Sequence, residues 1–376
     1  MTLVLNEEQR QLQETAKKFV AEHAPVRALR KLRDDNDPLG YSKQLWQQMT
    51  ELGFASITIP EAYDGLGFGF MGMGAVLEEF GRTLTASPLQ ASVVLGGSAI
   101  ELAGSQTQKQ ALLPAIATGE LTLALALEES HHHNPHTTAT RAEKSGDQYI
   151  LNGKKTFVLD GHSADKLIVV ARTGNSEDAV SFLLVDANSE GVTRTRTKMI
   201  DSRNAARITL HNVSVPHDSV LGAEDDASAA LAQVLDRGRI CLAAEMLGGI
   251  LEAFERTVTY LKDREQFGVK IGSFQALQHR AAIMYTEIEL CKSVVIAALS
   301  ALDEQSDDVP QLASLAKARV NDTYELVSNE AVQMHGGIGV TDDLEIGFFL
   351  KRARVAMQAL GDAAFHRDRY ATLAGY

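Results

Sequence analysis

Two separate segments of the chain carry side chains that suit a ligand with phosphate groups and a flat ring. The first runs from Arg264 to Gly268 where a long helical stretch breaks, and Gln275 follows it. The planar guanidinium of an arginine binds phosphate oxygens in bidentate fashion, and the same segment offers an amide and an aromatic ring. The second segment runs from Gln333 to Gly339 and sets glycines at 336, 337 and 339. Backbone amides there can approach a phosphate without a Cβ in the way.

The composition of the chain excludes several classes of function. Its 376 residues suffice for two or three packed units. A net charge of −13 argues against nucleic acid as a partner, because binding nucleic acid needs a basic surface. Cys241 and Cys291 lie in apolar helical rows, which indicates core residues in a reducing compartment. The first residues do not resemble a secretion signal, and no apolar run approaches the roughly 18 residues of a membrane span. We therefore expect a cytoplasmic protein with no membrane partner.

Residues 1–118 are expected to form an all-α domain. Asn6 precedes apolar residues at helical spacing, with acidic residues in the first turn, which predicts a helix start. Helical patterns also occupy residues 45–52, 71–82 and 88–103. Ser87 and Pro88 predict an N-cap followed by a proline at the first helical position.

Residues 119–224 change character and predict a β-barrel or sandwich domain. Short apolar runs alternate there with polar residues, for example at 149–151, 167–171 and 181–185. Asn152 and Gly153 form a dipeptide that predicts a two-residue hairpin turn between two of the strands.

Residues 225–376 return to long helical patterns and predict a bundle of four or five helices. Leu231, Val234 and Leu235 begin one apolar row, and Phe274, Leu277, Ala281, Met284, Ile288 and Cys291 form another. Large bundles with wide apolar faces often oligomerise. The fold class predicted for the whole chain is α+β, with helices first, a β domain in the middle and a helical bundle last.

Together, in this order and within long helices, the two ligand-binding segments resemble those of the acyl-CoA dehydrogenase family. The resemblance implies that the chain binds FAD. In that family the first segment, here Arg264, Gln266, Phe267 and Gln275, holds the FAD of its own subunit. The second segment, here Gln333, Gly336 and Gly337, reaches the FAD of a neighbouring subunit. The resemblance therefore implies a homotetramer or an α2β2 tetramer with a related subunit, an acyl-CoA substrate, and an electron-transfer flavoprotein as electron acceptor.

The residues that do the chemistry in this family are missing at their usual positions. Family members remove a proton from the acyl α-carbon and pass a hydride from the β-carbon to flavin N5, so a carboxylate must reach the α-carbon. Many members carry this base as a glutamate in a stretch that matches residues 351–362 here, where Leu360 takes its place. Others carry it just before an arginine that matches Arg239, and that position is Gly238. Asp362, two residues from the first position, is the candidate for a displaced base.

The segment that faces the flavin in the family also departs from the pattern. Leu127 and His133 replace the hydroxyl residues that bind flavin and substrate, and the resemblance gives His133 a substrate-binding role. Phe157 matches the aromatic residue that lies against the flavin, and Leu159 replaces the hydroxyl donor near N5, where a backbone amide can still serve. Arg239 is expected to form an internal ion pair with Asp236 at the start of its helix, or to help place the thioester, and the two roles are compatible.

Several alternatives remain open at this stage. His131, His132, His133 and His136 invite a metal site, but no cysteine or spaced carboxylate completes a ligand set, so we predict no metal and a polar loop at the acyl-CoA mouth. The departures resemble subunits of heteromeric acyl-CoA dehydrogenases that act on bulky acyl chains. The chain is thus expected to be an FAD-dependent acyl-CoA dehydrogenase whose base is displaced or supplied by a partner. The alternatives are a non-catalytic FAD-binding or structural subunit, and a diverged flavoprotein oxidase on a small acidic substrate.

Overall fold

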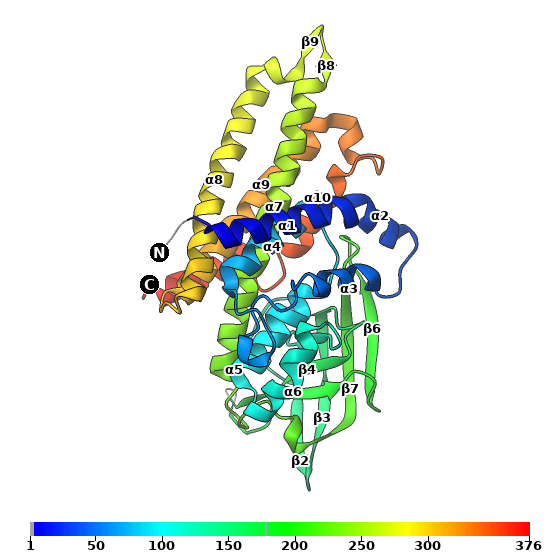
Figure 1. Cartoon of the computed structure of the whole chain (residues 1–376), viewed down its shortest axis with the longest axis vertical. Helices are drawn as coiled ribbons and strands as arrows, with labels where there is room; N and C mark the ends of the chain where they lie inside the picture. The colour runs from blue at the N-terminus through cyan, green and yellow to red at the C-terminus, as the bar shows by residue number, and fades with distance from the viewer. Residues whose placement is uncertain (1–3, 177–178) are drawn as a thin grey trace. The chain divides into compact units, whose positions relative to one another are not determined.

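The computed structural model describes residues 4–176 and 179–376. The described residues form two compact units, which Figure 1 traces along the chain. The helical unit comprises the described residues up to 31 together with 70–85 and 239–376. The sheet unit comprises residues 32–69 and 86–238, again where they are described.

Most of the chain is helical. In chain order, the α-helices and the shorter helical turns are α1 (Glu7–His23), α2 (Val26–Asp34), α3 (Lys43–Glu51), η1 (Glu61–Tyr63), α4 (Gly69–Arg82), η2 (Leu89–Gly97), α5 (Ser98–Ala103), α6 (Gln106–Ala117), η3 (His217–Ser219), α7 (Ser228–Asp263), η4 (Ile271–Ser273), α8 (Gln275–Asp303), α9 (Val309–His335), η5 (Gly336–Val340), α10 (Ile346–Ala356) and α11 (Ala363–Leu373).

Helix α1 begins where the sequence predicts. The Asn6 side chain accepts a hydrogen bond from the backbone N–H of Gln9 at 2.8 Å, and the Gln9 side chain accepts from the backbone N–H of Asn6 at 2.9 Å. This reciprocal pair is a capping box, which satisfies two of the N–H groups that a helix start leaves without partners. Ala16, Phe19 and Val20 form the buried side of the helix, as their spacing predicts.

Glycines let helices α4 and α7 approach until their backbones touch. A Cβ added at Gly81 would lie 1.9 Å from the carbonyl oxygen of Glu245, and one at Gly248 would lie 1.8 Å from that of Glu78. Neither position therefore accepts a larger residue without separating the helices. Asp303, the last residue of α8, accepts hydrogen bonds from the first N–H groups of α4 and so fixes a third helix to this pair.

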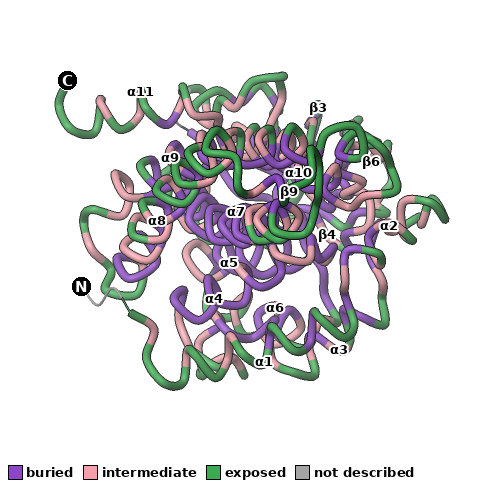
Figure 2. The backbone as a smooth tube through the Cα atoms, turned by 90° about the horizontal axis from the view of Figure 1, so that it is seen from above, coloured by how far each residue is buried: buried purple, intermediate pink, exposed green. Residues whose placement is uncertain are grey.

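Helices α7 to α11 form the C-terminal bundle that the apolar rows predict. Met284, Ile288 and Cys291 of α8 are buried, as expected from their spacing. Phe274 is not: it precedes the first residue of α8 and is exposed, because the first part of this helix has little of the protein packed against it. Figure 2 shows the long helix α7 drawn largely in the colour of buried residues.

The strands of the sheet unit form one mixed sheet. They are β1 (Leu123–Ala126), β2 (Arg141–Ser145), β3 (Gln148–Leu159), β4 (Lys166–Arg172), β5 (Val180–Asp186), β6 (Val192–Lys198) and β7 (Asn204–Pro216). Among the described strands the order is β1-β4-β2-β3-β7-β6, and β5 also pairs with β4. A separate small hairpin in the helical unit consists of β8 (Glu265–Gln266) and β9 (Val269–Lys270).

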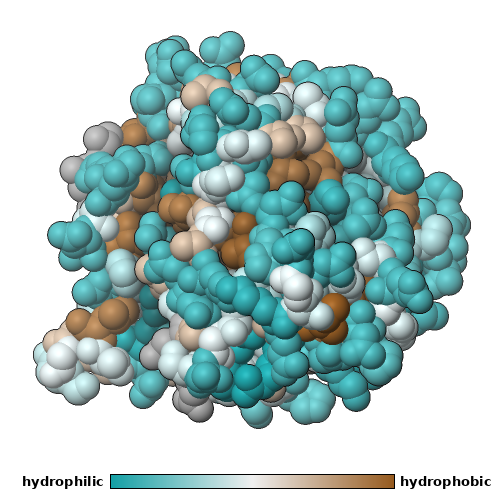
Figure 3. Space-filling model, turned by 90° about the horizontal axis from the view of Figure 1, so that it is seen from below, coloured by the Kyte–Doolittle hydropathy of each residue, from teal (hydrophilic) through white to brown (hydrophobic). Residues whose placement is uncertain are grey.

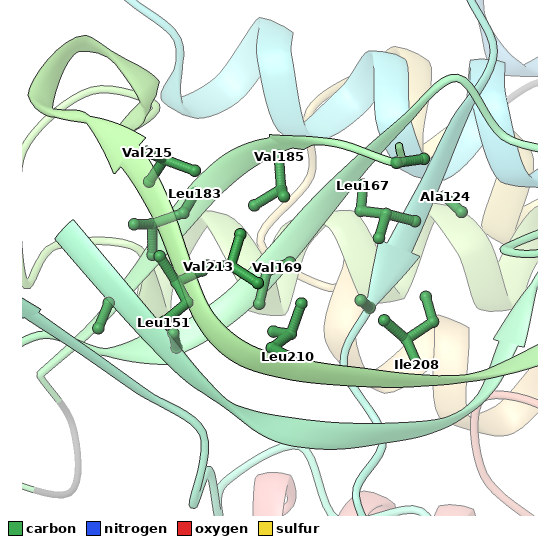
Figure 4. Packing of buried hydrophobic residues seen from close by; sticks show 14 of the residues in the cluster. Ala124, Leu151, Leu167, Val169, Leu183, Val185, Ile208, Leu210, Val213 and Val215 are labelled. Atoms are coloured by element: carbon green, nitrogen blue, oxygen red, sulfur yellow. The ribbon is translucent and has the colours of Figure 1, made fainter. Parts of the chain in front are cut away.

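Apolar side chains from several strands meet on one side of the sheet. Leu167 and Val169 of β4, Leu183 of β5, and Ile208 and Leu210 of β7 are buried together in this cluster. Figure 4 shows these side chains converging inside the curve of the strands. Buried and more exposed residues alternate along β3, whereas β1 and β4 are buried along almost their whole length. The β pattern is therefore visible in the sequence partly as alternation and partly as continuous apolar runs.

The hairpin turn predicted at Asn152-Gly153 is wrong. Strand β3 continues through both residues, and the register against β7 shifts there by a bulge between Leu151 and Gly153. The Asn152 side chain bonds Asn212 across the strands, accepting from its backbone N–H at 2.8 Å. A Cβ at Gly153 would lie 2.3 Å from Oγ1 of Thr140. Glycine is therefore required by the close approach of the segment that contains Thr140, and not by a turn. The true turn joins Ser145 to Gln148.

The helix predicted from residue 88 begins later and has another form. Its first nine residues, Leu89–Gly97, are a π-helix, and the α-helix α5 follows only at Ser98. Pro88 itself occupies the N-cap position, and no described side chain caps this start, so the predicted cap at Ser87 is wrong. The reason is tertiary: the Ser92 hydroxyl accepts from the backbone N–H of Leu123 at 2.8 Å, which joins this segment to strand β1.

The surface is mixed in character. On the face drawn in Figure 3, hydrophobic residues are interspersed with hydrophilic ones. Within the described ranges, no helix is long and apolar enough to cross a membrane.

Candidate functional site

The first predicted ligand segment forms the hairpin β8–β9. Figure 1 shows this hairpin beyond the ends of α7 and α8. Phe267 and Gly268 form its turn with φ angles of 55° and 79°. Positive φ at both central residues is typical of a tight hairpin turn, but it strains a phenylalanine. The Phe267 side chain is 90% exposed, and its ring meets that of Phe274 edge-on at 6.2 Å. A strained, exposed aromatic residue indicates a binding surface.

Arg264, Gln266 and Gln275 lie around this hairpin. The backbone of Arg264 continues the last turn of α7, its N–H bonding the carbonyl of Tyr260, and its own carbonyl accepts from Ile271 at 2.9 Å. All three side chains are exposed. Lys270 pairs with Glu265 across the hairpin, and this cation lowers the pKa of the Glu265 carboxyl.

The second predicted segment forms the turn η5 after helix α9. Gly336 ends the helix with a φ of 65°, in the region that favours glycine. Among the described residues, no heavy atom lies within 4 Å of a Cβ built at Gly336 or Gly337, so there is open space above both backbone positions. Gly339 differs, because a Cβ there would lie 2.5 Å from the carbonyl oxygen of Val332. Gln333 is exposed on the last turn of α9.

Within the helical unit, the residues that precede these two segments lie in contact. Tyr260, one turn before Arg264, stacks on His335, the residue before Gly336, with ring centroids 4.3 Å apart. His335 Nδ1 lies 2.7 Å from the carbonyl of Ala331, so Nδ1 carries the hydrogen. Burial lowers the pKa of His335, which keeps the ring neutral at physiological pH. This pair was not predicted, since nothing in either segment alone indicates it.

In the sheet unit, Phe157 stands on a second bulge of strand β3. The register against β7 shifts between Lys155 and Val158, which inserts one extra residue on β3. Phe157 has a φ of 48° there and is 43% exposed. Leu159 is the last residue of the strand and is partly buried. The bulge therefore turns an aromatic ring out of the sheet, as a residue that lies against a ligand requires.

A buried lysine fixes the loop next to Phe157. Lys155 Nζ donates to the carbonyl of Leu127 at 3.0 Å and to the Glu129 carboxylate at 2.7 Å. Glu129 also accepts from the backbone N–H groups of Ala139 and Thr140, so it closes the loop 129–140. Burial lowers the pKa of Lys155, and the Glu129 carboxylate opposes this effect. The contacts of Lys155 with Leu127 and Glu129 were not predicted from the sequence. The signal that could have indicated them is a lysine at a position of an alternating strand where a buried residue is expected.

The histidines of this loop do not gather around a metal. No group of histidine, cysteine and acidic residues that could hold a metal ion occurs among the described residues. His131, His132 and His136 are exposed, whereas His133 places Nδ1 against the Glu128 carboxylate. The backbone carbonyl of Glu128 accepts from Thr156, next to Phe157. The predicted substrate residue His133 thus lies beside the strand that carries the predicted flavin residue.

The last part of segment 351–362, where the family resemblance places the base, forms the turn between α10 and α11. Leu360 has a φ of 59° and Gly361 one of 110°. The carbonyl oxygen of Leu360 accepts from Arg239 Nε at 3.2 Å and from His366 Nε2 at 3.1 Å. The Asp362 carboxylate accepts from the backbone N–H of Phe365 at 2.8 Å. Asp362 is therefore the N-cap of α11, a role that aspartate favours and that its sequence position could have indicated.

The other two predicted residues of this region lie on helix α7. Gly238 belongs to the sheet unit, where its carbonyl accepts from the buried side chain of Gln90 at 2.9 Å. Arg239 belongs to the helical unit and is buried, with its guanidinium carbon 5.4 Å from the centre of the Phe365 ring. Its contact with the carbonyl of Leu360 fixes the turn that carries residue 360.

Comparisons with known proteins cover the whole chain. The N-terminal, middle and C-terminal domains of acyl-CoA dehydrogenases match residues 6–120, 126–213 and 228–373. Mitochondrial isovaleryl-CoA dehydrogenase of Pongo abelii is 31% identical over 375 residues, which cover 96% of this chain and 88% of that protein. The chain belongs to the acyl-CoA dehydrogenase family. It has the family's fold, so the predicted fold class is confirmed.

Two further similarities concern proteins that are named as parts of complexes. The CarC subunit of the caffeyl-CoA reductase–Etf complex of Acetobacterium woodii is 28% identical over 361 residues, covering 94% of each protein. A chain of the ChsE4–ChsE5 complex of Mycobacterium tuberculosis has a TM-score of 0.91 and 26% identity, with both chains covered completely.

The residues present fit the cofactor of this family. Acyl-CoA dehydrogenases are FAD-dependent flavoproteins. The exposed Arg264 and the open space above Gly336 and Gly337 suit phosphate groups, and the exposed ring of Phe157 suits a flat flavin. When bound, FAD supplies the hydride acceptor.

Proposed function

We propose that this chain is one subunit of a heteromeric FAD-dependent acyl-CoA dehydrogenase, and that a related partner subunit supplies the catalytic base. One observation carries the proposal: neither position at which family members place the base offers a proton acceptor. Leu360 has an aliphatic side chain and Gly238 has none. General-base catalysis is worth about 10²- to 10⁴-fold in rate, so the reaction needs a base from elsewhere.

The similarities to complexes support this assembly. The likeness to a chain of the ChsE4–ChsE5 complex favours an α2β2 tetramer with a related subunit over a homotetramer. The likeness to CarC, a subunit of an Etf complex, favours an electron-transfer flavoprotein as electron acceptor. The substrate is an acyl-CoA thioester that is oxidised between its α- and β-carbons.

In this proposal the two ends of the chain's site have separate tasks. Arg264, Gln266, Phe267 and Gln275 bind the pyrophosphate and adjoining groups of the cofactor, and Gln333, Gly336 and Gly337 reach the cofactor of a neighbouring subunit. Phe157 lies against the flavin ring, and the backbone at Leu159 donates to it. His133 and Arg239 place the acyl-CoA. Each of these side chains or amides binds or orients and none removes a proton, which leaves that step to the partner.

Two alternatives remain testable. The first keeps the reaction within this chain: Asp362 accepts the α-proton, although its carboxylate also caps α11. The second makes the chain a non-catalytic FAD-binding subunit, which the lack of a base at residues 238 and 360 equally favours.

Anaerobic titration of the flavin-loaded protein with a panel of acyl-CoA thioesters tests the proposal. The isolated chain is expected to bleach its flavin slowly or not at all, and co-expression with a related subunit that carries the glutamate is expected to restore turnover. If Asp362 is the base, Asp362→Asn abolishes reduction and leaves FAD bound. Fast bleaching of both the isolated wild type and the Asp362→Asn variant by octanoyl-CoA would contradict the proposal.

Binding of FAD has its own test. Arg264→Ala removes a charge-assisted contact worth about 1.5–3 kcal/mol, which corresponds to roughly 10- to 150-fold weaker FAD binding. Lys262→Ala is the matched control, because Lys262 is an exposed cation at the same end of α7. Equal FAD occupancy in the two variants would remove Arg264 from the site, and a flavin-loaded monomer in light scattering would exclude a shared site.

A further inference from the structure

Lys317 is a fully buried cation to which the roles above assign no task. It lies on helix α9 and has no exposed surface. Its Nζ donates to Oδ1 of Asn321 at 2.9 Å, to the carbonyl of Ala356 at 3.0 Å and to the carbonyl of Gly361 at 3.1 Å. Three acceptors at this range match the three N–H donors of an ammonium group, whereas a neutral amine has only two.

Opposing effects act on the charge of the Lys317 amine. Burial lowers its pKa well below the usual range, and Arg239 and Arg352 act in the same direction, while Asp362 raises it. Ala356 is the last residue of α10, so its carbonyl belongs to the negative end of that helix. The ammonium therefore takes the place of the N–H groups that would follow if the helix continued.

Side chains from several helices hold the same turn. Asn321 Nδ2 donates to the carbonyl of Met357 at 3.1 Å. Arg239 and His366 both donate to the carbonyl of Leu360. The backbone from 356 to 361 is thus fixed from α7, α9 and α11, and this explains how Leu360 is held at a positive φ that strains any residue with a Cβ.

We propose that Lys317 is the positioning residue for residue 360: it holds the turn in a geometry fit for a catalytic carboxylate, although the turn carries a leucine. This inference rests on the proposed function, in which Leu360 occupies a position where family members place the base. A carboxylate installed there would accept the α-proton as the Cα–H bond breaks, and bound oxidised FAD would supply the acceptor for the β-hydride. The chain thus lacks the base but keeps its support.

The experiment installs the carboxylate and then removes its support. Leu360→Glu in the isolated, flavin-loaded chain is expected to raise the rate of anaerobic flavin reduction by octanoyl-CoA about 10²- to 10⁴-fold. Adding Lys317→Met is expected to remove at least a factor of about ten of this gain and to leave FAD occupancy unchanged. It also removes a nearby cation, so the apparent pKa of the installed carboxyl, measured from the pH–rate profile, is expected to rise.

Two further variants keep the test decisive. Asn321→Ala removes one acceptor of Lys317 and the bond to Met357, so a smaller loss of the gain is expected even if Lys317→Met does not fold. Lys292→Met, at a surface lysine paired with Glu289, is the control and is expected to leave the gain intact.

The outcomes separate the inference from the proposed function. A gain that survives both Lys317→Met and Asn321→Ala with an unchanged pH profile overturns the positioning role. No gain from Leu360→Glu, while the wild type turns over with a partner subunit, overturns the inference and leaves the proposed function standing. Absence of turnover in the partner complex and in every variant overturns both.

Discussion

Glu79 of α4 offers the clearest test of the electrostatics inside the helical unit. Its side chain is only 6% exposed, and its nearest cation is Arg82, with Nε 3.8 Å from the carboxylate. The same guanidinium lies 3.6 Å from Glu252 and 3.0 Å from Glu255. One cation shared among several carboxylates cannot compensate the burial of Glu79. Glu79→Gln is therefore expected to stabilise the protein at a pH where the carboxylate is charged.

The magnitude follows from the pKa. Burial raises the pKa of Glu79 from 4.5 to about 7, Arg82 opposes the rise and Glu78 adds to it. At about 1.4 kcal/mol for each pKa unit, the ceiling is about 3 kcal/mol in the free energy of unfolding. The pKa of Glu79 is higher in the folded protein than in the unfolded chain, so protonation of Glu79 favours the folded wild type. This contribution to the free energy of unfolding is fully present below pH 4.5 and is lost as the pH rises through 7.

Denaturant unfolding of both proteins at pH 5 and pH 8 measures the effect. Glu79→Gln is expected to gain about 1–3 kcal/mol over the wild type at pH 8 and clearly less at pH 5. Glu255→Gln is the control, because its side chain is 55% exposed and a surface pair is worth about 0–1 kcal/mol. A gain for Glu79→Gln that is equal at both pH values, or no gain at pH 8, would refute the reasoning.

Two further predictions concern packing and capping. Gly248→Ala forces a Cβ against the carbonyl of Glu78 and is expected to lower the free energy of unfolding by about 1–3 kcal/mol or more. Gly347→Ala in α10, where no described atom lies within 4 Å of the added Cβ, is expected to be neutral or stabilising. Thermal unfolding of the two variants compares these effects. Asn6→Ala removes the capping box of α1 and is expected to cost about 1 kcal/mol, visible as faster amide exchange in that helix; unchanged exchange would contradict the cap.

Local signals in the sequence predict local structure well. The start at Asn6 is confirmed because both halves of its capping box lie within four residues. The predicted turn at Asn152-Gly153 is wrong because this dipeptide also occurs at bulges, and the deciding contacts come from Thr140, just before β2, and from Asn212 of β7. These tertiary contacts favour a bulge over a turn, and they cannot be read from the residues next to Asn152 and Gly153 in the sequence.

The candidate site likewise has features that neighbouring residues in the sequence indicate and features that depend on distant contacts. The helix break after Arg264 and the glycine-rich turn at Gly336 are visible in the sequence, but the hairpin β8–β9 is not. Neither segment is specific alone, since glycine-rich turns are common and an arginine near an aromatic residue often occurs by chance. The role of Asp362 as a cap could also be read from the sequence, because aspartate is favoured at the N-cap of a helix. The bond from Arg239 to the carbonyl of Leu360 was not visible, because Leu360 lies more than a hundred residues away.

Two buried lysines link these observations. Lys155 donates to the carbonyl of Leu127 beside the predicted flavin strand, and Lys317 donates to the carbonyls of Ala356 and Gly361 beside residue 360. A buried ammonium costs several kcal/mol in desolvation, and apolar residues of similar size are often as stable or more so. Stability alone therefore does not explain either lysine. What each provides is a fixed backbone: one ammonium directs several carbonyl or carboxylate groups at once, which an apolar side chain cannot do. Both loops therefore require a defined backbone geometry, which these two lysines hold in place.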